Sequence, residues 1–182
     1  DKGYVKTDDN LMSSIDGVYA VGDALNKYDY QIVIAMGEAA KVALEISRRW
    51  VDVDNKKIVV FGGGTGLSYL LKGLKDFPLD ITAVITVSDD GRSTGKLREE
   101  FHAPAVGDIR KVLSSLSSTS QNIKDMLEYR FNTTSDLDGH ALGNLILISL
   151  LNITGSLKES INELCTLLDI KNKVLPLTED AS

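Results

Sequence analysis

Cysteine is almost absent from this sequence, and so are long hydrophobic runs. The single cysteine, Cys165, excludes an internal disulfide, a CxxC redox pair and a thiolate metal cluster. Because it lies beside the apolar helical pattern of Leu157, Ile161 and Leu164, we expect it to be buried as a small hydrophobic residue. The longest apolar run, residues 145–151, is far too short to span a bilayer, so we expect no membrane insertion.

Basic residues are fewer than acidic residues in this sequence. The 20 Lys and Arg residues face 26 Asp and Glu residues, and the formal net charge of −6 argues against a broad nucleic-acid surface. We therefore expect no nucleic-acid partner. The hydrophobic fraction of 43% is ordinary for a soluble globular protein, and 182 residues suffice for one or two domains. No signal-peptide pattern precedes the first strand-like segment, so we expect the cytoplasm.

The most informative pattern is IVVFGGGTGLS, residues 58–68. Its apolar, β-branched start predicts a strand buried on both faces of a parallel sheet. The glycines that follow let the backbone turn sharply, and leucines at helical spacing then predict a helix. A strand, a glycine loop and a helix N-terminus together form a phosphate site. We assign ligand binding to the loop and the first helical turn: Gly62, Gly63, Gly64, Thr65, Gly66 and Ser68.

The loop matches neither of two familiar glycine motifs. A Walker A loop needs a Lys directly after its spacer, and the next lysine here is Lys72. The dinucleotide fingerprint fits Gly64 and Gly66 but meets Tyr69 where its third glycine belongs. A glycine-rich turn that only closes a βα unit is the alternative.

Two adjacent carboxylates, Asp89 and Asp90, follow a second apolar strand at residues 80–87. In a doubly wound sheet, the loops after neighbouring strands form the ligand crevice. Carboxylates there can hold a ribose, bind Mg²⁺ through water or orient a base. An Asp-Gly turn with Ser93 as a helix cap explains the same residues equally well.

Two further segments add candidate ligand contacts. Gly107 and Asp108 begin a predicted helix, where an acidic residue is favourable, whereas Arg110 in the same first turn needs a phosphate or a carboxylate nearby. His140 and Asn144 lie one helical turn apart on one face of a later helix. A lone His near a helix start is more often structural, but the pairing favours a ligand contact. We assign these five residues to ligand binding, and none as catalytic or as a metal ligand.

Residues 1–50 form a separate pattern, with two short strands near residues 4–6 and 18–21 and then a long amphipathic helix. This segment closely resembles the C-terminal end of the FAD domain of thioredoxin reductases. The resemblance implies that Gly22 and Asp23 contact FAD and that Gln31 lies against the flavin ring. The NADPH domain and the CxxC motif of those enzymes are missing, so we expect a vestigial segment without bound FAD or reductase activity.

The remainder, residues 57–182, resembles the bacterial gluconeogenesis factor family, whose members are nucleotide-sugar-binding regulators related to 2-phospho-L-lactate transferases. The motifs GGGTGLS, SDDGRSTG, VGDIRKVLSSLS, GHALGNLILISLL and VLPLTED carry the resemblance, in this order. It implies a Rossmann-like fold, binding of a UDP-sugar such as UDP-N-acetylglucosamine, and a role in carbon metabolism and cell shape. Family members continue past the end of this sequence, so we expect an incomplete domain.

The expected fold is α/β: a truncated three-layer Rossmann-like parallel sheet, with strands near residues 57–61, 81–87 and 173–176. A junction at residues 51–56 joins it to a small N-terminal β/α appendage. The expected function is that of a non-enzymatic UDP-sugar-binding regulator fused to a thioredoxin reductase fragment, with no cofactor required. The alternatives are a 2-phospho-L-lactate transferase-like enzyme and a fragment of an FAD-dependent disulfide reductase. A homo-oligomer is left open.

Overall fold

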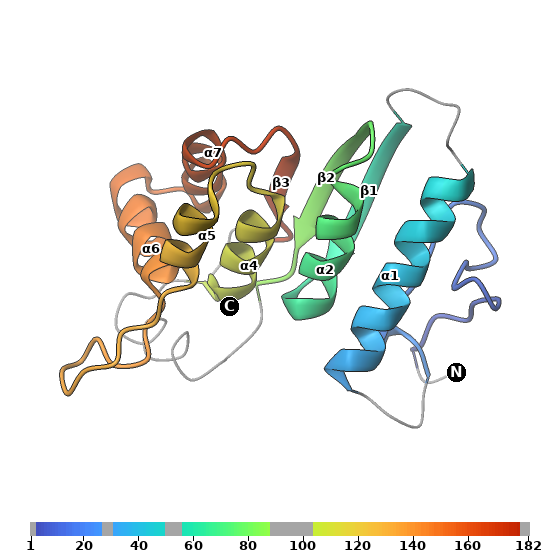
Figure 1. Cartoon of the computed structure of the whole chain (residues 1–182), viewed down its shortest axis with the longest axis horizontal. Coiled ribbons are helices and arrows are strands. Elements are labelled where there is room, and N and C mark those ends of the chain that lie inside the picture. The colour runs from blue at the N-terminus through green and yellow to red at the C-terminus, as the bar shows by residue number, and fades with distance from the viewer. Residues whose placement is uncertain (1–2, 27–30, 50–55, 88–103, 179–182) are drawn as a thin grey trace.

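The structure is a computed structural model that describes residues 3–26, 31–49, 56–87 and 104–178. Its centre is a three-stranded parallel sheet flanked by helices (Figure 1). The α/β class expected from the sequence is confirmed. The predicted carboxylates Asp89 and Asp90 lie outside the described residues.

The sheet consists of β1 (Lys56–Gly62), β2 (Leu79–Ile85) and β3 (Lys173–Pro176), in the order β1-β2-β3. Both pairings are parallel, as the apolar strands alternating with helical patterns predict. Ala83 of β2 lies opposite Val60 of β1 and Val174 of β3, so these three small apolar side chains share one face.

Helices accompany the sheet in the described part of the chain. They are α1 (Ile32–Arg49), α2 (Gly64–Leu74), α4 (Gly107–Leu116), α5 (Gln121–Glu128), α6 (Leu142–Thr154) and α7 (Leu157–Leu167), with a short 3₁₀ turn η1 (Gly22–Ala24) before α1. Helix α2 connects β1 to β2, and α4 to α7 precede β3. Figure 1 shows α4 between α2 and α5. Cys165 on α7 is buried as expected.

One face of the sheet is buried and the other is open in the described part of the chain. Ile81, Ala83 and Ile85 are fully buried. Val59 and Phe61 point to the opposite face and are 56% and 69% exposed. The expectation that β1 is buried on both faces is therefore wrong for this chain, because the described helices pack on one face only.

Helix α1 packs on α2 rather than standing apart. Ala39 and Val42 are buried in the same core as the leucines of α2, and a Cβ on Gly73 would lie 3.3 Å from the Cβ of Ala43. The apolar stripe read from the sequence is thus partnered. The two short strands expected before it are wrong, since the chain makes only single bridges there, Val5 with Leu25 and Met12 with Tyr19.

No helix in the four described ranges is both long enough and apolar enough to cross a membrane.

Candidate functional site

The glycine loop turns the chain from β1 directly into α2. Gly62 has φ +155° and Gly64 has φ +68°, which are backbone conformations that favour glycine. Gly63 is the N-cap residue of α2, and no side chain caps the helix. Because the N-cap residue is a glycine, its side chain cannot satisfy the first-turn N–H groups, as expected where a helix N-terminus is to bind an anion.

Two other segments pack tightly against this loop. The Thr86 N–H donates to the Gly62 carbonyl at 2.8 Å, and the Thr86 hydroxyl lies against Gly63. A Cβ on Gly63 would lie 2.7 Å from Oδ2 of Asp108, so only glycine fits there. Asp108 is buried and accepts from Lys111 at 3.0 Å. The structure thus brings together two segments assigned to ligand binding, the glycine loop and the start of α4.

A pocket of about 440 Å³ opens beside the glycine loop. One wall is made by five of the predicted ligand residues: Gly62, Gly63, Gly64, Thr65 and Gly66. The other wall is made by the N-terminal segment and includes Gly22, Asp23 and Gln31. The Gly22 N–H donates to Glu38 at 2.9 Å, whereas Asp23 and Gln31 are exposed. Two motifs that the sequence assigns to different ligands therefore border a single pocket.

Arg110 is buried, with 3% of its side chain exposed, and forms an ion pair with Glu128 of α5. A Cβ on Gly143 would lie 2.9 Å from Cγ and Cδ of Arg110, so the missing side chain makes room for the arginine stem. Burial lowers the pKa of Arg110, and the negative charge of Glu128 partly opposes that shift. The anion that Arg110 requires is thus a carboxylate of the protein itself. Neither Glu128 nor Gly143 had been picked out from the sequence.

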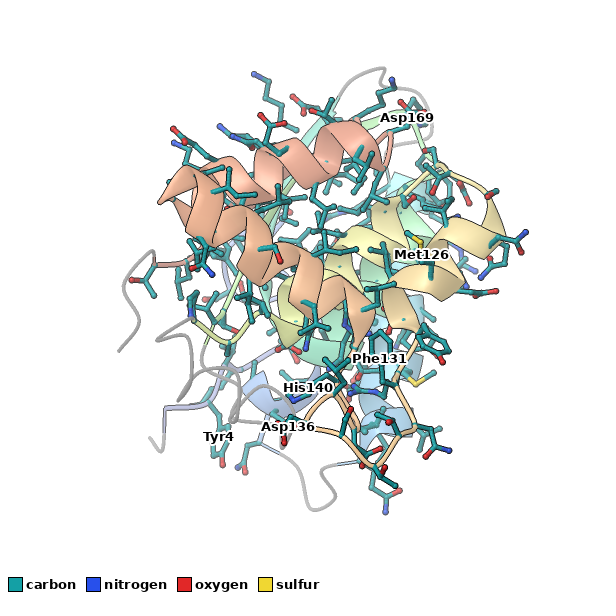
Figure 2. The ribbon with its side chains drawn as sticks, turned by 90° about the vertical axis from the view of Figure 1, so that its left-hand side faces the viewer. Tyr4, Met126, Phe131, Asp136, His140 and Asp169 are labelled. Carbon is teal, nitrogen blue, oxygen red and sulfur yellow. The ribbon has the colours of Figure 1, made fainter. Side chains whose placement is uncertain are left out.

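His140 and Asn144 are both buried, but they do not share a helix face. Helix α6 begins at Leu142, so the predicted helical pairing is wrong and His140 precedes the helix. His140 is not helical because it belongs to the loop between α5 and α6. In this loop the His140 carbonyl accepts a hydrogen bond from the Phe131 N–H at 3.1 Å, and Figure 2 shows these two residues side by side. The Oδ1 atom of Asn144 is buried without a hydrogen-bond partner among the described residues.

The remaining predicted site residues do not line the glycine-loop pocket. Asp108, Arg110, His140 and Asn144 are behind it in the protein interior, and Ser68 faces a different hollow between α2, α4 and α5. Gly107 is buried at the start of α4. Within the described ranges, no group of three or more His, Cys, Asp or Glu side chains could hold a metal ion.

A parallel sheet whose first strand enters a glycine loop and then a helix defines a Rossmann-like α/β protein. The sequence profile of the family described as 2-phospho-L-lactate transferase CofD matches residues 58–182. The chain belongs to this family.

Curated relatives of the chain are named gluconeogenesis factor or putative gluconeogenesis factor. The chain is 52% identical over 120 residues to the gluconeogenesis factor of Bacillus subtilis, an alignment that covers 66% of this chain and 38% of that protein. A relative in Clostridium acetobutylicum is 36% identical over 169 residues, covering 93% of this chain and 37% of the relative. That alignment is longer than residues 57–182 alone can supply, so it includes much of the N-terminal segment.

The fold also matches a solved structure. A crystal structure of a Bacillus halodurans protein, described as a member of the UPF0052 family, is 46% identical in sequence with a TM-score of 0.67. The match covers 69% of this chain and 40% of that protein. The chain thus spans about two fifths of the length of the relatives it matches.

Proposed function

We propose that this chain belongs to a UDP-sugar-binding regulator of the gluconeogenesis factor type. The observation that carries the proposal is the tight packing of Thr86 and Asp108 against Gly63, beside an uncapped helix N-terminus and an open pocket. This packing fixes the loop with its backbone N–H groups available, an arrangement suited to a pyrophosphate.

The nucleotide-sugar class comes from the resemblance of residues 57–182 to the gluconeogenesis factor family, and the relatives carry that family name. In the proposed complex, Gly62 to Gly66 and the first turn of α2 hold the pyrophosphate of UDP-N-acetylglucosamine. Asp89 and Asp90 take hydroxyl groups of the ligand. Asn144 is buried and does not line the glycine-loop pocket, so the contact with a uracil or sugar edge that its sequence pattern favours is not part of this proposal.

Calorimetric titration with UDP-N-acetylglucosamine, UDP and NAD tests the proposal. Binding of the UDP ligands and not of NAD is the expected result. Gly66→Ala is the sharpest variant, because Gly66 lies in the first turn of α2 and a Cβ there meets only the Ala35 Cβ at 3.8 Å. The fold accepts the methyl group while backbone approach by a phosphate is obstructed, so we expect at least tenfold weaker binding. Binding of NAD alone would point instead to a dehydrogenase-like site.

The second candidate is a transferase of the 2-phospho-L-lactate type, favoured by the family that the chain matches. Such an enzyme moves a phosphoester from a nucleotide donor to a deazaflavin precursor with Mg²⁺. Incubation of the purified chain with those substrates and Mg²⁺ separates the two functions. Under our proposal no transfer product forms, and steady product formation would favour the enzyme.

The N-terminal segment is proposed to be a vestigial relative of the flavoprotein FAD domain. Its predicted contacts Gly22, Asp23 and Gln31 border the glycine-loop pocket. The absorbance spectrum of the purified protein tests this reading, and we expect no flavin bands. Stoichiometric flavin would support the disulfide-reductase alternative.

A further inference from the structure

A second hollow of about 450 Å³ lies between α2, α4 and α5, the three neighbouring helices in the centre of Figure 1. Its volume falls within the range of small-molecule sites, about 300–1,000 Å³. Thr65 is the single lining residue that it shares with the glycine-loop pocket. Apart from Thr65, the two hollows are lined by different residues in the described part of the chain, so we treat them as separate sites.

The walls of this hollow carry an excess of positive charge. Four lysines line it, against two carboxylates: Lys72, Lys75, Lys111 and Lys124, with Asp125 and Glu128. This excess is unusual in a chain of net charge −6, and it concentrates anions locally.

The carboxylates of the wall are engaged by other groups. Asp125 accepts from Gln121 at 2.7 Å, and Glu128 pairs with the buried Arg110. Of the lysines, Lys111 pairs with Asp108. Gln121 is neutral, so Asp125 keeps its charge, and the remaining three lysines face this one carboxylate in the wall.

Lys75 and Lys124 lie at the centre of this arrangement. Both also line an adjoining hollow of about 370 Å³, so they stand where the two hollows meet. The Lys75 ammonium donates to the Ser117 carbonyl at 3.3 Å, which orients it. Burial lowers the pKa of Lys75, and the positive charges of Lys124 and Lys72 lower it further. Lys75 therefore lies close enough to Lys124 and to Lys72 to be repelled by both, and the negative charge of Asp76 opposes part of this effect.

We propose that this hollow, the lysine groove, binds the phosphate of a small phosphorylated metabolite through Lys72, Lys75 and Lys124. A phosphate places two negative charges in a small volume, and lysine binds it as a mobile point charge. A bound dianion replaces the repulsion among the three ammonium groups with attraction. The concave shape favours a compact ligand over an extended acidic peptide.

Titration with inorganic pyrophosphate at low ionic strength tests the lysine groove, because salt screens such contacts. We expect saturable binding by the wild type, and at least tenfold weaker binding by Lys75→Met and by Lys124→Met. Methionine keeps the apolar stem of lysine and removes its charge. Lys158→Met is the matched control, since Lys158 is an exposed lysine on α7 outside the groove, and we expect wild-type affinity.

Four outcomes would overturn the proposal. The first is the absence of saturable pyrophosphate binding, and the second is equal weakening by Lys158→Met, which would show a general charge effect. The third is tighter binding of a hexaglutamate peptide than of pyrophosphate, which would assign the groove to an acidic protein segment. Gly66→Ala separates this proposal from that of the glycine loop, because it should weaken UDP-N-acetylglucosamine and leave binding in the groove intact. Loss of pyrophosphate binding in Gly66→Ala, with full binding in both groove variants, would place pyrophosphate at the glycine loop instead.

Discussion

The carboxylate of Asp108 lies so close to the backbone of Gly63 that a Cβ on the glycine would be 2.7 Å from Oδ2. The two residues are 45 positions apart in the chain and belong to different elements, the β1–α2 turn and the start of α4. Their contact joins the glycine loop to a buried side chain, so the conformation of the loop depends on tertiary packing as well as on its glycines.

Gly63→Ala should therefore destabilise the protein. The new methyl group collides with Asp108 and Thr86, and overpacking of this kind costs about 1–3 kcal/mol. Gly37→Ala is the matched control, because nothing lies within 4 Å of a Cβ in that position of α1. Removing a helical glycine there should stabilise the fold by about 0.5–1 kcal/mol. Urea unfolding of the two variants compares the free energies, and equal effects would contradict the packing argument.

Replacing one partner of the buried ion pair between Arg110 and Glu128 should cost more stability than replacing the other. Glu128→Ala leaves the Arg110 guanidinium buried without its carboxylate, which costs about 3–5 kcal/mol. Arg110→Met should cost less, because methionine fills the space beside Gly143 and the freed Glu128, 42% exposed, turns to water. Chemical denaturation measures the free energy of unfolding of both variants. A greater loss of stability for Arg110→Met would show that the guanidinium stabilises the fold by more than its ion pair with Glu128.

A control for that comparison is available on α7. Glu163→Ala removes an exposed carboxylate, and we expect its free energy of unfolding to stay within about 0.5 kcal/mol of the wild type.

The sequence predicted what depends on local pattern. The glycine loop, the parallel strands and the amphipathic helix α1 each follow from spacing within some 20 residues, and the structure contains all three. Partners distant in the chain were not predictable. The carboxylate beside Arg110 comes from Glu128 on another helix, and room for the arginine stem comes from Gly143. Nothing in the sequence around Arg110 indicates either residue.

The same limit explains the errors. A continuous apolar run in β1 is compatible with burial on both faces, yet burial is decided by what packs on each face. His140 was placed on a helix because the apolar pattern of α6 begins beside it. The backbone is instead held by hydrogen bonds to Phe131 and Leu137, which a helical period cannot reveal.

The same substitution at two neighbouring positions of β1 compares the loss of stability on its buried face with that on its exposed face. Val60→Thr places a hydroxyl on the buried face and should cost about 1–3 kcal/mol. Val59→Thr makes the same change on the face that is 56% exposed, so its effect should stay within about 0.5 kcal/mol. Thermal or urea unfolding measures the stability of both variants. A large loss at Val59 would mean that this face is covered in solution, for example by a second copy of the chain.

Cys165 predicts a loss of stability at alkaline pH. Cys165 lies on α7 in the hydrophobic core, and this burial raises the pKa of its thiol from 9.0 to about 11. In the unfolded chain the thiol ionises first, so its contribution is complete below pH 9 and is lost as the pH rises through about 11, by up to roughly 2–3 kcal/mol. Other groups also titrate in this range, so the measurement is the difference between the wild type and Cys165→Ala in urea unfolding at pH 7, 9 and 10.5. A difference that stays constant with pH would show that the thiol ionises equally in both states. Slow alkylation of the native thiol at pH 9, with fast alkylation in urea, would provide independent support.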